Sequence, residues 1–123
     1  MRIINYFLYI CTQYKIHMLV TFEHNYLQEL YQSGKASDKK HRFQPDIVKK
    51  YKRCIDFLVS ANNIESLYKI NSLNYEALSG DKKGISSIRV NDQYRIEFVV
   101  AQLETEPIIT VCNIIELSNH YKK

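Results

Sequence analysis

Two arginines in the C-terminal half of the chain stand where they could act together on an anion. Arg89 and Arg95 lie in two segments of alternating apolar and polar residues. If Asn91-Asp92-Gln93 forms a three-residue loop, Ile88 pairs with Ile96 and the two arginines oppose each other on the polar face. Opposed guanidinium groups bind phosphate and stabilise charge that develops on phosphorus.

Glu97 offers a second interpretation of the same pattern. In this register Ser87 lies opposite Glu97, beside the arginines. A cross-strand Arg–Glu ion pair would then satisfy one arginine without any function. Composition alone favours this ion pair over a phosphate.

A short basic loop precedes the arginines. Gly80 and Gly84 bracket Asp81, Lys82 and Lys83, but the Gly-Lys-Ser/Thr ending and the following helix of a Walker loop are missing. A turn with exposed lysines explains the pattern, although a lysine here would also lie near a phosphate held by the arginines.

His120 follows the last long apolar segment, Ile108–Leu117, after Ser118 and Asn119. A histidine at the exit of a strand can serve as a general acid or base, whereas a lone terminal histidine is more often simply exposed. His17, His24 and His41 share no ligand spacing with it, so we expect no metal site. The three cysteines include no Cys-x-x-Cys pair, and we expect reduced, buried thiols in a cytoplasmic protein (Cys11, Cys54, Cys112).

The region between Lys35 and Arg53 is strongly basic. It suits an acidic partner or RNA phosphates, but a solvated helix face explains it equally well. Eight basic residues stand against Asp38 and Asp46: Lys35, Lys39, Lys40, Arg42, Lys49, Lys50, Lys52 and Arg53.

The first 17 residues differ from the rest. They contain no acidic residue, and their apolar run, Tyr6 to Ile10, is far shorter than the roughly 18 residues that span a bilayer. We expect residues 1–17 to be a leader extension, and Met18 to begin a single domain over residues 18–123.

Hydrophobic spacing predicts the elements that position these residues. Helical spacing gives way to a period of two after Tyr75. The predicted order is a strand over Leu19–Glu23, a helix capped by Asn25 and stopped by Gly34, a helix that begins at Pro45, a short turn over Ile64–Ile70, two strands around Asn91-Asp92-Gln93, a turn over 101–107 and a central strand over Ile108–Leu117. This is an α+β fold in which two N-terminal helices pack on a three- to four-stranded, mostly antiparallel sheet.

The segment from Leu78 to Phe98 resembles the signature of HigB-type killer toxins of the RelE/ParE superfamily. It reads LSGDKKGISSIRVNDQYRIEF, and His120 matches the closing histidine of that pattern. The resemblance extends from Met18 to Lys122 and implies a RelE/ParE-like fold. It also implies a toxin that cuts messenger RNA in the ribosomal A site without metal or cofactor, and that a small helix-turn-helix, HigA-like antitoxin silences.

The resemblance also implies roles for residues in attack of a ribose 2′-hydroxyl on the adjacent phosphate. Arg95 would stabilise the phosphorane, His120 would act as acid or base, and Tyr94 would stack on a base. Arg89, with Lys82 or Lys83, would hold the RNA backbone. The chain departs from the pattern in two places: Glu76 stands where a histidine is frequent and would replace it as general base, and Ser118-Asn119 precede the closing histidine where Asp-Tyr is frequent.

Two other functions fit the same residues. One is a non-enzymatic toxin that resembles the ParE branch and binds DNA gyrase. The other is an inactive remnant that binds the antitoxin and reaches operator DNA only through it. None of the three functions requires a membrane.

Overall fold

The computed structural model describes residues 18–104 and 108–119. The expected leader over residues 1–17 and the predicted site residue His120 lie outside these ranges. The elements, in chain order, are β1 (Met18–Phe22), α2 (Asn25–Gln32), the 3₁₀ turn η1 (Lys39–His41), α3 (Pro45–Ser60), α4 (Glu65–Tyr68), η2 (Asn71–Leu73), β2 (Glu76–Ala77), η3 (Gly80–Lys82), β3 (Ser86–Arg89), β4 (Tyr94–Leu103) and β5 (Ile109–Asn119).

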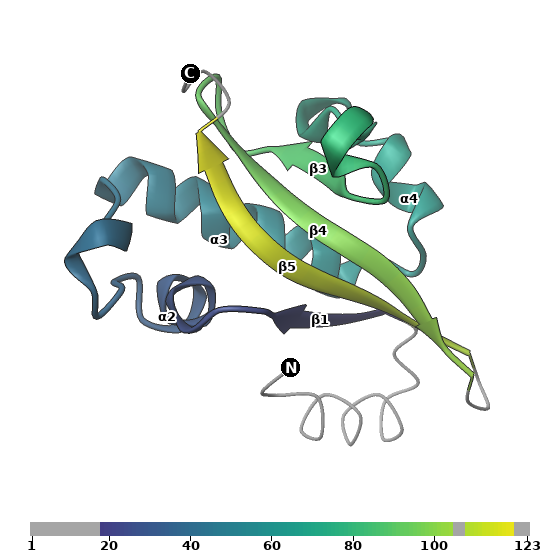
Figure 1. Ribbon diagram of the computed structural model, residues 1–123, viewed down its shortest axis with the longest axis horizontal. Coiled ribbons are helices and arrows are strands. Elements are labelled where there is room, and N and C mark those ends of the chain that lie inside the picture. Colours follow the sequence, from purple (N-terminus) through teal and green to yellow (C-terminus); the bar gives the residue numbers. More distant parts are fainter. Residues whose placement is uncertain (1–17, 105–107, 120–123) are drawn as a thin grey trace.

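The sheet has the strand order β1-β5-β4-β3-β2, and helices α2 and α3 lie on one side of it (Figure 1). β1 pairs with β5 in parallel, and the other pairs are antiparallel. The predicted α+β architecture and the central position of the last strand are confirmed. The sheet has one strand more than the three or four that were predicted. This additional strand, β2, is only two residues long, which is too short to be recognised from side-chain alternation.

The predicted register of β3 and β4 is confirmed. Ile88 pairs with Ile96, and Arg89 stands opposite Arg95. The Asn91 side chain fixes the three-residue loop, because its Oδ1 accepts hydrogen bonds from the backbone N–H groups of Gln93, at 2.8 Å, and Tyr94, at 2.7 Å. Side-chain alternation therefore places the two arginines on one face of the sheet.

The boundaries of α2 and α3 follow local chemistry. Pro45 is at the start of α3, as predicted, because its missing N–H needs no partner there. Gly34 stops α2 with a φ of +82°, and its N–H donates to the carbonyls of Glu29 and Leu30. The predicted cap is displaced by one residue: His24 occupies the cap position and Asn25 is already helical.

The hydrophobic core lies between the helices and one face of the sheet. Tyr51, Ile55 and Leu58 of α3 are fully buried, as are Ile96 and Phe98 of β4. Helix α2 is tied to α3 by the Tyr51 hydroxyl, which donates to the carbonyl of Leu27 at 2.7 Å. Both helices pack on this face, and the opposite face carries polar side chains that include the buried Ser87, Arg95 and Glu97.

Strands β4 and β5 are longer than predicted and contain an irregularity. β4 continues to Leu103 and β5 begins at Ile109, so the turn expected over 101–107 is shorter, because Ala101 to Leu103 pair with Ile109 to Val111. The register shifts between Glu97 and Phe98, which leaves Ile115 as an extra residue in β5.

Candidate functional site

Arg95 lies on the sheet face that the helices leave free, and it is held by the protein. Its Nε donates to Ser87 Oγ at 2.8 Å, and its Nη2 donates to the carbonyls of Asn74, at 2.6 Å, and Ser87, at 3.3 Å. A Glu76 carboxylate oxygen lies 3.9 Å from the same nitrogen. These contacts fix the guanidinium plane and leave the two Nη1 hydrogens without a partner among the described residues.

The other cations on this face are paired with carboxylates. Lys82 Nζ donates to Glu97 Oε2 at 2.8 Å, and Arg89 forms an ion pair with Asp92. The expected Arg–Glu97 pair is therefore absent from the described contacts, because the η3 turn carries Lys82 over the sheet and Lys82 takes Glu97 instead. The structure brings together Glu76 and Arg95, and it places Lys82 beside the strands that carry both arginines.

Burial and pairing change the proton affinities in this group. The hydrogen bond to Glu97 raises the pKa of Lys82, and burial lowers the pKa of Arg95. Lys82 therefore stays charged although its partner Glu97 is buried. Both side chains are cationic at neutral pH.

Two predicted residues lie apart from this group. Tyr94 packs edge-to-face on Phe43, with ring centroids 5.5 Å apart, against the helix side of the sheet. It precedes Arg95 in the strand, so the alternation that directs Arg95 to one face directs Tyr94 to the other. Lys83 is exposed at the end of η3, and its side chain makes no ion pair with a described residue.

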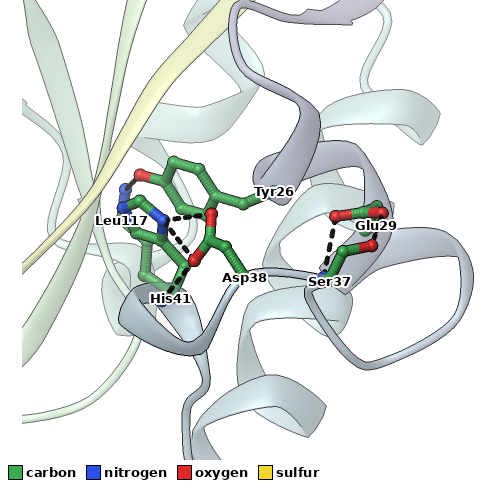
Figure 2. A network of polar contacts seen from close by, with 6 residues as sticks. All are labelled: Tyr26, Glu29, Ser37, Asp38, His41 and Leu117. Carbon is green, nitrogen blue, oxygen red and sulfur yellow. Dashed lines mark hydrogen bonds and ion pairs between the residues drawn. The ribbon is translucent and has the colours of Figure 1, made fainter.

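A second polar cluster joins α2 to the segment that follows it (Figure 2). The His41 ring stacks on Tyr26, with centroids 3.6 Å apart, while its Nδ1 lies 3.0 Å from both Asp38 carboxylate oxygens. The Tyr26 hydroxyl in turn accepts a hydrogen bond from the backbone N–H of Leu117 in β5. The sequence holds no signal for this cluster, because Tyr26 and His41 are isolated in it and become neighbours only through the fold.

Other site classes find no support in the described ranges. No three His, Cys, Asp or Glu side chains in residues 18–104 and 108–119 are grouped to hold a metal ion. Cys54 and Cys112 are buried free thiols, as predicted, and burial raises their pKa values to about 11 and about 12. No helix within the same ranges is long and apolar enough to cross a membrane.

Comparison with family models identifies the family of this chain, and comparison with solved structures supports its fold. Residues 20–108 match the model of the HigB-like toxins, described as RelE-like toxins of the type II toxin-antitoxin system HigB. E. coli YafQ, crystallised as a histidine-to-glutamine variant, has the same fold, with a TM-score of 0.52 and 12% identity over 82% of this chain and 91% of that chain. A YoeB/ParE toxin from Agrobacterium tumefaciens gives a TM-score of 0.47 and 15% identity over 85% of this chain and 100% of that chain. No curated protein sequence matches the chain.

Proposed function

We propose that this chain, which belongs to the HigB-like family of RelE-like type II toxins, is a metal-independent endoribonuclease that cleaves messenger RNA on the ribosome. The observation that carries the proposal is the grouping of Glu76, Arg95, Arg89 and Lys82 on the face of the sheet opposite the helices. A carboxylate beside fixed cations is what proton abstraction and charge stabilisation at a phosphate require.

Glu76 is the proposed general base. Its side chain is 46% exposed and lies next to Arg95, so a ribose can approach the carboxylate while the arginine meets the adjacent phosphate. In this mechanism Glu76 takes the proton of the 2′-hydroxyl, whose oxygen attacks phosphorus. The bond to the 5′-oxygen breaks, which leaves a 2′,3′-cyclic phosphate and a 5′-hydroxyl end.

The remaining roles belong to cations. Arg95 presents its free Nη1 hydrogens to the phosphorane, and Arg89 and Lys82 hold the backbone on either side, with Lys83 as a more distant contact. His120, which follows β5 directly in the sequence, protonates the leaving oxygen. The base-stacking role is not assigned to Tyr94, because that ring packs on Phe43.

The proposed partners follow from the family. A type II toxin has a cognate antitoxin, which we propose to be a HigA-like helix-turn-helix protein that also carries the toxin to operator DNA. The ribosome and its bound message are the proposed target, which requires the toxin to act in the cytoplasm.

Primer extension tests the proposed activity. A defined message bound to 70S ribosomes is incubated with the protein and with its Glu76→Gln and His120→Ala variants. We expect new 5′ ends within the A-site codon, absent without ribosomes and strongly reduced with either variant. An intact message at high protein concentration would refute the proposal.

One observation favours a second candidate, a non-enzymatic toxin of the ParE type. Lys82 and Arg89 already have carboxylate partners, and three of the hydrogen bonds of Arg95 go to the protein itself. A binding protein would need these groups only for its structure. Inhibition of DNA gyrase by a protein that leaves ribosome-bound message intact would establish this function instead.

A further inference from the structure

A cavity of about 590 Å³ opens between α2, α3 and the segment that joins them, away from the arginine face. We refer to it as the helical groove. Its floor is apolar and is formed by Leu30, Ala36, Phe43, Pro45 and Val48. Leu30, Ala36 and Val48 are buried members of the core, so the floor is part of the rigid body of the protein.

The rim of the helical groove is basic. Lys35, Arg42, Lys49, Lys52 and Arg53 surround the floor, and none of these five cations forms an ion pair with a described residue. The one carboxylate in the lining, Asp56, accepts a hydrogen bond from the Tyr31 hydroxyl. Lys82 and Arg89 on the arginine face are paired with carboxylates, whereas the five rim cations lie together without such partners among the described residues.

The helical groove is shaped before any partner arrives. The Glu29 carboxylate accepts hydrogen bonds from the backbone N–H of Ser37, at 3.1 Å, and from its hydroxyl, at 2.5 Å (Figure 2). Asp38 in turn accepts from the backbone N–H of His41 at 2.8 Å. These contacts fix the segment that directly follows Ala36, so a ligand would meet a floor that needs little ordering.

We infer that the helical groove is a docking site for an acidic, amphipathic helix contributed by the cognate antitoxin. Apolar side chains at positions i, i+3, i+4 and i+7 of such a helix would enter the floor, and its carboxylates would pair with the five rim cations. That the helix comes from the antitoxin rests on the proposed function. The chemistry of the helix rests on the groove alone.

Other occupants fit the groove less well. RNA would match the basic rim, but its flat bases suit aromatic stacking surfaces, and Phe43 is the only aromatic side chain in the described lining of this mainly aliphatic, concave floor. The chain's own residues 1–17 include Arg2 and Lys15 and no acidic residue, so their charge has the wrong sign. An acidic face with apolar anchors satisfies both parts of the groove.

Fluorescence anisotropy with a synthetic probe tests the inference. The probe is a labelled peptide of about 15 residues, with Leu at i, i+3, i+4 and i+7 and Glu at most other positions. A second peptide carries Lys in place of Glu. The groove variant combines Lys49→Glu with Arg53→Glu, and the matched control combines Lys50→Glu with Lys69→Glu, which makes the same charge change at exposed residues outside the groove.

We expect the acidic peptide to bind the unaltered protein and the control, to lose at least about tenfold in affinity for the groove variant, and the basic peptide not to bind. Equal weakening in both variants, or no binding at all, would overturn the inference. Circular dichroism of both variants checks that they are folded.

Two further arms separate other partners from the proposed one. In the first arm, a single-stranded RNA is tested in place of the peptide. If the groove variant binds this RNA more weakly than the unaltered protein does, while its affinity for the acidic peptide is unchanged, the groove is an RNA-binding surface and the inference is wrong. In the second arm, self-association is measured. If the unaltered protein forms a concentration-dependent dimer and the groove variant does not, the groove is a dimer interface and the inference is also wrong. Cleavage of ribosome-bound message is measured separately, so a failed peptide assay is not confused with a failed nuclease.

Discussion

At the scale of single residues, Glu76 separates the enzyme from a binding protein. We predict that Glu76→Gln keeps the fold, because the side chain is half-exposed, and lowers single-turnover cleavage of ribosome-bound message by about 100- to 10,000-fold, the usual contribution of a general base. Glu104→Gln, in an exposed residue at the end of β4, is the matched control. Equal cleavage by the two variants would exclude Glu76 as the base.

Arg95 and Arg89 differ in what they contribute to stability. Removal of the buried Arg95 leaves Ser87 and the Asn74 carbonyl without their donor, and we predict that Arg95→Ala lowers the free energy of unfolding by about 1–3 kcal/mol. Arg89 is 39% exposed in its ion pair, so Arg89→Ala should cost at most about 1 kcal/mol. Urea titration of both variants measures the difference, and equal costs would contradict it.

The sequence could predict the opposition of these two arginines but not what they bind. Opposition follows from the alternation on both sides of Asn91, and only one loop length keeps Ile88 and Ile96 on the same face. The partners of Arg95 depend on where η2 and β2 return to the sheet. Neither of these short segments has a period that the sequence could reveal.

At the scale of elements, the segment between α2 and α3 should be sensitive to acid. Hydrogen bonds from Ser37 lower the pKa of Glu29, and hydrogen bonds from His41 are the main cause that lowers the pKa of Asp38. A carboxylate whose pKa is lower in the folded than in the unfolded protein stabilises the fold. This contribution is complete when the pH is above the ordinary pKa, which is 4.5 for Glu29 and 3.8 for Asp38. It is lost as the pH falls through the pKa of the folded state.

We therefore predict that stability falls on acidification below about pH 5, and that the fall is shallower in a Glu29→Gln, Asp38→Asn double variant. Thermal unfolding across this pH range measures both slopes. NMR titration of the two carboxyl groups provides the direct check, and ordinary pKa values at both positions would contradict the prediction.

The elements also show where hydrophobic spacing stops being informative. The spacing predicts α3 well, because a long helix repeats its apolar face several times. The irregularity in β5 occurs at a single residue, so no repeated pattern in the sequence predicts it. With Ile115 inserted, Ile114 and Leu117 both face the core, a spacing that plain strand alternation does not allow.

At the scale of the whole molecule, we expect the protection of backbone amides from hydrogen exchange to depend on the position of each strand in the sheet. We predict that the slowest backbone hydrogen exchange occurs in the buried centres of β4 and β5, around Phe98 and Cys112. The two-residue edge strand β2 should exchange faster by a factor of at least about 100. NMR-detected exchange measures this ratio. Uniform protection across the sheet would mean that β2 opens only with the entire fold.

The parallel pairing of β1 with β5 has a consequence for the timing of synthesis. β1 can form its pairing with β5 only after β5 has been synthesised. The same holds for the hydrogen bond from the Thr21 hydroxyl to Asn113 Oδ1, which joins residues 92 positions apart in the sequence. Because β5 also flanks Arg95, the proposed cleavage site is completed only after β5 has been synthesised. A nascent chain that still lacks β5 therefore cannot have the proposed cleavage site, even when β3 and β4 are already present.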